Sequence, residues 1–119
     1  MPLTLRSCPD YLAVGGSGLY TLLESQEHFR ELSAAVGGLR KAGRPVRVLV
    51  DLRDGAPQTA EVAAHIKGAN AVIFRKGDRI AIIVKSTLLK LQVKRLHMRS
   101  ESEVFVSEAA AREFLSRAS

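Results

Sequence analysis

The chain has 119 residues, of which 46% are hydrophobic and 25% are charged, and its formal net charge is +6. This composition excludes a disordered chain, and the length corresponds to one domain, 1–119, that can bury a core without disulfides. We find no apolar run long enough to cross a membrane and no signal peptide, and Cys8 is the only cysteine, so we expect a cytoplasmic protein.

Two short strands are predicted at the beginning of the chain, at 3–6 and 11–15. The glycine-rich run at 15–18 predicts a turn that ends the second strand. This run lacks the Gly-Lys-Ser/Thr ending of a phosphate-binding loop. Ser25 is a good N-cap residue, and apolar residues recur at helical spacing after it, so we expect a helix over 25–41.

Strands and helices alternate over the rest of the predicted chain. The strand at 80–84 is apolar throughout, which is typical of a parallel strand covered on both faces. The pattern predicts an α/β fold with a single mixed, largely parallel sheet flanked by about four helices. The predicted strands are 46–51, 80–84 and 103–106. The predicted helices are 59–75, 86–98 and 107–116, for which Thr59, Ser86 and Ser107 are the expected N-caps.

Three stretches of the chain resemble one known family. They are RPVRVLVDLRDGAP at 44–57, DRIAIIV at 78–84 and VFVSEAAAREFL at 104–115. In element order and strand-loop pattern they resemble the SpoIIAA-like group of STAS domains. This group is related to bacterial anti-sigma-factor antagonists and, more distantly, to lipid-binding CRAL-TRIO domains. The resemblance implies a bacterial cytosolic protein whose sheet is flanked by helices.

The resemblance also bears on regulation by phosphorylation. Antagonists of this kind carry an Asp-Ser-Ser-Gly-Leu-like stretch whose serine is phosphorylated by a partner kinase. The corresponding stretch here is Pro-Gln-Thr-Ala-Glu-Val at 57–62, in which Gln58 and Thr59 take the equivalent place. It has no serine, and Glu61 stands where the family has glycine. We therefore expect that the chain is not a serine phosphoswitch.

Asp51 and Asp54 lie at the carboxyl end of the predicted strand at 46–51, at the edge where open α/β sheets bind ligands. Two carboxylates there could bind a cation or act as acid and base. Alternatively, Asp51 simply ends the strand and Asp54 forms a turn before Gly55. We predict no metal site, because the three histidines are far apart in sequence, and we expect each to lie on a helix surface or its border.

The segment from Lys85 to Arg99 is the most basic part of the chain, and no acidic residue interrupts it. Its apolar residues, including Leu88 and Leu91, form a stripe at helical spacing. Such a helix could lie on an acidic membrane or grip phosphates. Alternatively, the stripe faces the core and the basic face is solvated. The candidate residues for an anionic surface are Lys85, Lys90, Lys94 and Arg95.

Three functions are compatible with these features. The first is a non-catalytic regulatory or binding module for a partner protein or a small ligand, without a cofactor. The second is a lipid or acidic-membrane binding module. The third is a small hydrolase that uses Asp51 or Asp54. Among partners, a protein, an anionic lipid or a second copy of the chain in a homodimer is favoured over nucleic acid, although the positive charge suits all anionic partners.

Overall fold

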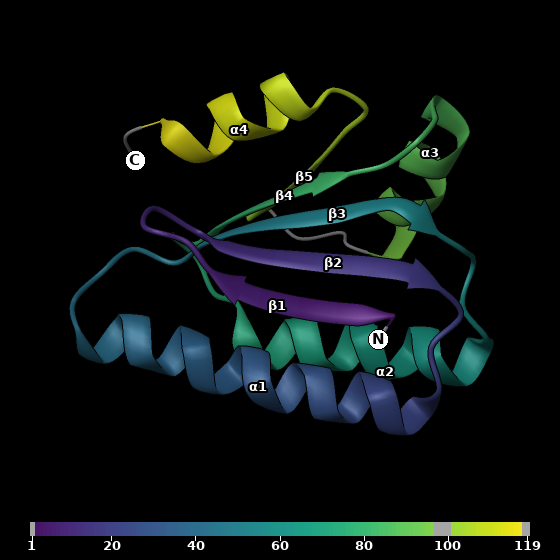
Figure 1. Cartoon of the computed structure of the whole chain (residues 1–119), viewed down its shortest axis with the longest axis horizontal. Coiled ribbons are helices and arrows are strands. Elements are labelled where there is room, and N and C mark those ends of the chain that lie inside the picture. Colours follow the sequence, from purple (N-terminus) through teal and green to yellow (C-terminus); the bar gives the residue numbers. More distant parts are fainter. Residues whose placement is uncertain (1, 97–100, 118–119) are drawn as a thin grey trace.

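The computed structural model describes residues 2–96 and 101–117. Within them, strands and helices follow one another as the sequence predicts (Figure 1). The strands are β1 (Leu3–Ser7), β2 (Leu12–Gly18), β3 (Arg47–Gly55), β4 (Arg79–Ile83) and β5 (Ser102–Phe105). The helices are α1 (Leu22–Lys41), α2 (Ala60–Ile73), α3 (Thr87–Leu96) and α4 (Glu108–Ser116).

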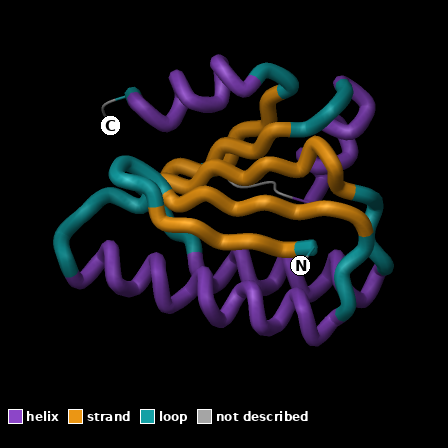
Figure 2. The backbone as a smooth tube through the Cα atoms, viewed as in Figure 1, coloured by secondary structure: helices purple, strands orange, loops and turns teal. Residues whose placement is uncertain are grey.

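The five strands form one sheet in the order β1-β2-β3-β4-β5. β1 pairs with β2 antiparallel, and all later pairs are parallel, which confirms the predicted mixed sheet. β3 and β4 lie inside the sheet, as their apolar sequences predict. Because the strand order follows the chain and crossovers between parallel strands are right-handed, α1, α2 and α3 all fall on one face. Figure 2 shows α4 on the other face.

Alternation along β4 divides the core between these two faces. Ile80 and Ile82 belong to the larger cluster, which contains residues of α1 and α3. Ala81 and Ile83 belong to a smaller cluster with Leu115 of α4. Both clusters are aliphatic for the most part, and together they bury every residue of the run at 80–84.

The glycine-rich run does not form the predicted turn. β2 continues through it to Gly18, which has a positive φ of 61° and is the residue at which the chain turns. Gly16 lies at an irregularity in the pairing with β3, and a Cβ there would collide with the hydroxyl of Tyr20. The glycines therefore make room for a neighbouring side chain within a strand, rather than forming a loop.

The first helix begins earlier than predicted. Thr21, and not Ser25, is the N-cap: its hydroxyl accepts from the Glu24 amide at 3.0 Å, and the Glu24 carboxylate accepts from the Thr21 amide at 2.8 Å. Residues 19–21 form the connection from β2 into this helix. Ser25 lies inside α1 and is completely buried.

The remaining predicted helix caps are confirmed. The hydroxyls of Thr59, Ser86 and Ser107 each accept a hydrogen bond from a backbone amide in the first turn of the following helix, at 3.3 Å. The third helix was predicted to extend to 98, and its last two residues lie outside the described part of the chain.

An ion pair ties the end of α1 to the turn before β4. Two guanidinium nitrogens of Arg40 donate to the two carboxylate oxygens of Asp78 at 2.9 and 2.8 Å. Arg40 also donates to the Ile73 carbonyl, and Asp78 accepts from the Arg75 amide. The Asp78 carboxylate raises the pKa of Arg40, chiefly through this hydrogen bond. Only 5% of the Asp78 side chain is exposed, so the pair is largely shielded from water.

Candidate functional site

The helices on the larger core face leave a cavity over the middle of the sheet. In the described residues, the α2 backbone packs closely against α1 rather than against a strand, whereas α1 lies close to β1 and α3 close to β5. No helix backbone therefore lies directly on β3 and β4 on this face. The resulting cavity has a volume of about 480 Å³.

The cavity is lined for the most part by apolar side chains. Val48 of β3 is fully buried, whereas Val50 and Leu52, the next residues on the same face of that strand, are only partly buried and open into the cavity. Ile66 of α2 and Leu89 of α3 also line the cavity. The described lining includes no Asp, Glu, Lys or Arg. The cavity therefore suits an apolar ligand.

Gln58 closes one part of the cavity rim. Its carbonyl oxygen accepts from the Tyr20 amide at 2.8 Å, and its amide nitrogen donates to the carbonyls of Gly18 and Ala56, both at 2.8 Å. These bonds join the β2–α1 connection to the β3–α2 connection. Gln58, which the family resemblance aligns with the phosphorylated stretch, thus holds two loops together, and Thr59 beside it caps α2.

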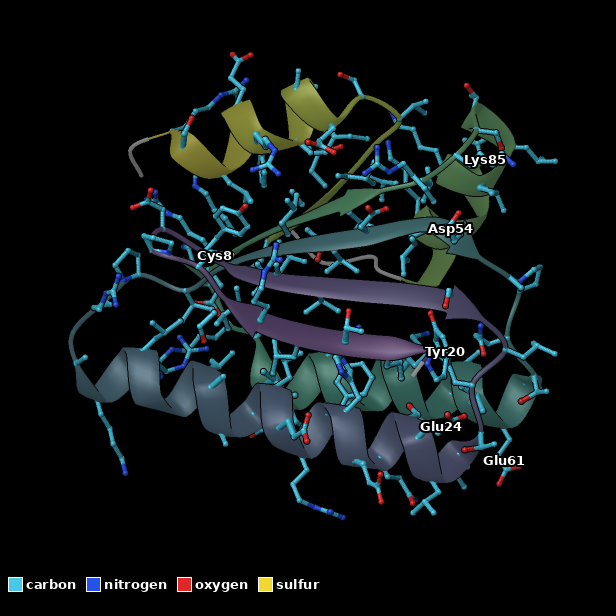
Figure 3. All side chains as sticks on the ribbon, in the orientation of Figure 1. Cys8, Tyr20, Glu24, Asp54, Glu61 and Lys85 are labelled. Atoms are coloured by element: carbon cyan, nitrogen blue, oxygen red, sulfur yellow. The ribbon has the colours of Figure 1, made fainter. Side chains whose placement is uncertain are left out.

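The cavity lining also contains the polar residues Tyr20, His28, Asn70 and Ser102, and of these Tyr20 and His28 are more than nine-tenths buried. Tyr20 is 8% exposed and His28 is 6% exposed. Figure 3 shows Tyr20 at the end of the sheet where the parallel strands terminate. Burial raises the pKa of Tyr20 and lowers the pKa of His28, although Glu31 partly opposes the second change. The prediction that His28 lies on a helix surface or its border is wrong, because its side chain is buried and lines this cavity.

His65 joins α2 to α1 beside the cavity. Its Nδ1 lies 2.8 Å from the Ser25 hydroxyl, and its ring contacts Phe29 edge-on. This pairing satisfies a hydroxyl that is completely buried, so Ser25 has no access to a substrate. The Ser-His pair therefore stabilises the packing of the two helices.

The two candidate carboxylates do not converge on a site. Asp51 accepts two hydrogen bonds from the Arg53 guanidinium, at 3.0 and 2.7 Å, and one from the Arg53 amide. Arg53 lowers the pKa of Asp51, chiefly through the side-chain bonds, and also pairs with Glu108 of α4. Neither Asp51 nor Asp54 lines the cavity. In the described chain, no group of three metal-ligating side chains comes together.

α3 presents both apolar and basic side chains to the outside. Leu89 and Val93 pack inward, but Leu88 and Leu91 are 66% and 56% exposed. The prediction that these two leucines widen the inward stripe is therefore wrong. Lys85 and Lys94 are also exposed, and Lys94 lies 4.0 Å from Glu103. Lys90 is partly exposed, and the Arg95 side chain lies outside what the structure describes.

A second hollow lies at the opposite end of the sheet, near Cys8 (Figure 3). Its volume is about 690 Å³, and its lining is more polar. Arg44 in its wall donates to the Pro9 carbonyl at 2.7 Å, and Arg112 donates to the Tyr11 hydroxyl at 2.9 Å. Cys8 is partly buried there. These arginines brace the loops around the hollow.

No pattern in the sequence indicates the cavity directly. Its lining comes from all five strands and from α1, α2 and α3, and most lining residues taken singly look like ordinary core positions. A usable signal would have been His28, since a histidine three residues after Ser25 and four before Leu32 lies on the inward face of α1. A polar residue on a buried face needs a partner or a ligand.

No protein-family model and no curated protein matches the chain. Among solved structures, the chain is similar to an uncharacterized protein of the DUF3478 family from Shewanella loihica PV-4, which has a SpoIIAA-like fold. The TM-score is 0.73 at 19% sequence identity, and the match covers 95% of this chain and 91% of that one. In the described residues, no helix is long and apolar enough to cross a membrane. The chain therefore has the SpoIIAA-like fold that its sequence resembles.

Proposed function

We propose that the chain is a non-catalytic binding module that holds a small apolar ligand in the cavity over β3 and β4. The observation that carries the proposal is the cavity itself. Its volume of about 480 Å³ lies within the range of known ligand sites, and apolar side chains dominate its lining. Protein interiors are normally close-packed, so an apolar ligand would recover contacts that the lining lacks.

This proposal favours one of the three functions that the sequence leaves open. A hydrolase centred on Asp51 or Asp54 has no support, because Asp51 is paired with Arg53 and both carboxylates lie away from the cavity. A regulatory role is compatible with ligand binding, since an occupied cavity would fix α2 and α3 relative to the sheet. We place the module in the bacterial cytoplasm on the basis of the family resemblance.

Filling the cavity will weaken ligand binding. Ala63 is a small residue of α2 that lines the cavity, so an Ala63→Phe substitution will project a ring into the space. We expect the affinity for a nonpolar fluorescent dye to fall at least about tenfold, because the ring occupies the ligand volume. Fluorescence titration of the purified protein measures this affinity.

The matched control is Ala64→Phe, which adds the same ring at an exposed position of the same helix. This control will bind the dye like the unmodified protein. Equal dye binding by both variants, with both folded by circular dichroism, would show that the dye does not use this cavity.

The outer face of α3 supports a second candidate function, docking on an anionic membrane. Leu88 and Leu91 are large, exposed apolar side chains, and Lys85 and Lys90 lie near them in sequence. A cationic helix with exposed leucines can lie at a lipid interface. Each lysine near an acidic surface contributes about 1 kcal/mol, and the leucines add apolar burial.

Replacing both leucines with glutamine will weaken association with acidic vesicles more than about tenfold, because buried apolar area and basic charge act together. Vesicle sedimentation at low and high salt measures the effect. The control is Val72→Gln, which removes another exposed apolar side chain from α2. If the unmodified chain shows no binding to phosphatidylserine vesicles at low salt, the outer face of α3 is not a membrane-docking surface.

A further inference from the structure

We propose that the ligand of the cavity is an uncharged aliphatic alcohol, or a larger molecule with the same features, whose hydroxyl is hydrogen-bonded by Tyr20 and His28. The inference rests on the proposed function and adds the chemical class of the ligand. It rests on two properties of the cavity. Most of its lining is apolar, and two of its polar side chains have no hydrogen-bond partner among the described residues.

The polar side chains are the first observation. Tyr20 and His28 are only 8% and 6% exposed, and both line the cavity. No described residue hydrogen-bonds the Tyr20 hydroxyl or the His28 ring; the Tyr20 backbone amide, by contrast, is bound by Gln58. Side-chain polar atoms that are sealed in the described core all have partners. These two groups therefore open into the cavity with their hydrogen-bonding capacity unused.

A hydroxyl matches what the two side chains offer. The Tyr20 phenol can donate one hydrogen bond and accept others, and a neutral imidazole donates from one ring nitrogen and accepts at the other. Burial lowers the pKa of His28, which favours the neutral ring. An alcohol oxygen can accept from one of these groups while its hydrogen is donated to the other.

The charge of the lining is the second observation, and it distinguishes an alcohol from a fatty acid. The described lining has no Lys or Arg to pair with a carboxylate. An ionised carboxylate that enters an apolar cavity without a positive partner loses its hydration and gains little in return. An alcohol leaves much less hydration behind and meets both available groups.

Gly16 leaves room for the Tyr20 hydroxyl. A Cβ at this position would collide with the hydroxyl and would also crowd Leu52. The bare strand at Gly16 therefore lets the phenol lie against β2 at the border of the cavity. The absence of a side chain at Gly16 therefore explains where the Tyr20 hydroxyl lies.

Three matched ligands test the proposal: heptanol, heptane and heptanoate, each measured by displacement of the nonpolar dye. Unmodified protein will bind heptanol, and heptanoate will bind most weakly of the three. Tyr20→Phe removes a single oxygen that bonds no described residue, so the fold is retained. In this variant the affinity for heptanol will fall about tenfold relative to that for heptane, which corresponds to one ordinary hydrogen bond.

His28→Phe provides the second variant, and we expect the same selective loss of heptanol binding. Tyr11→Phe, at the opposite end of the sheet, is the control and will leave all three affinities unchanged. The proposal is overturned if heptanoate binds most tightly, or if Tyr20→Phe weakens heptane and heptanol equally. If the dye binds but the ligands show no such selectivity, the apolar cavity remains and only the alcohol is excluded. If no apolar compound binds at all, the proposed function fails as well.

Discussion

Replacing Arg40 with alanine will lower the free energy of unfolding by about 3 kcal/mol. The substitution leaves the Asp78 carboxylate, which is 5% exposed, without its two charged hydrogen bonds. It also removes the donor to the Ile73 carbonyl at the end of α2. A loss of this size is a large fraction of the total stability of a small domain.

Urea denaturation followed by circular dichroism measures the change in the unfolding free energy. Arg30→Ala is the control, because it removes the same kind of side chain from an exposed position of α1. We expect the control to change stability by no more than about 0.5 kcal/mol. A loss of less than 1 kcal/mol for Arg40→Ala would mean that solvent replaces the guanidinium at Asp78.

The Ile83→Ala substitution will cost about 3 kcal/mol of unfolding free energy. Ile83 lies on an interior strand, is 1% exposed and packs in the smaller cluster beneath α4. Truncation removes apolar contacts and leaves a cavity that the short α4 helix can fill only in part. Because Ile83 faces away from the cavity over β3 and β4, ligand binding by the folded protein will be unaffected.

Thermal and urea unfolding of Ile83→Ala and Ile83→Val provide the measurement. The valine variant removes one methylene group and will cost about 1 kcal/mol. Similar losses for both variants would show that α4 moves inward to refill the space. Altered dye affinity in the folded alanine variant would contradict the separation of the two faces.

Most of the fold could be predicted from the sequence because its signals are local. Alternating apolar residues and hydroxyl caps mark the later elements, and Thr59 and Ser107 cap their helices as predicted. The turn predicted at the glycine-rich run was wrong because Gly16 serves a tertiary contact. It makes room for the Tyr20 side chain, and local turn propensities do not describe such a contact. The prediction that Ser25 caps the first helix was wrong for a similar reason, because the Ser25 hydroxyl pairs with His65 on another helix.

The candidate site could be predicted only in part. The sequence indicated a site at the polar residues in and after β3. In the structure, however, Asp51 bonds to a neighbouring arginine and Gln58 bonds to backbone groups. The cavity depends on how far α2 lies from the sheet, which no short pattern encodes. Leu88 and Leu91 fit the inward stripe by spacing, but α3 is rotated so that they face outward.

The strand order has a consequence for how the chain folds. Each strand pairs with the one that immediately precedes it, so no pairing waits for a distant part of the sequence. Each closure needs only a hairpin or one helical crossover, which keeps contact order low for a parallel sheet. As the chain leaves the ribosome, the sheet can grow from β1 toward β5. Because α3 and β5 both contribute to its lining, the cavity over β3 and β4 is completed only after the last strand has joined the sheet.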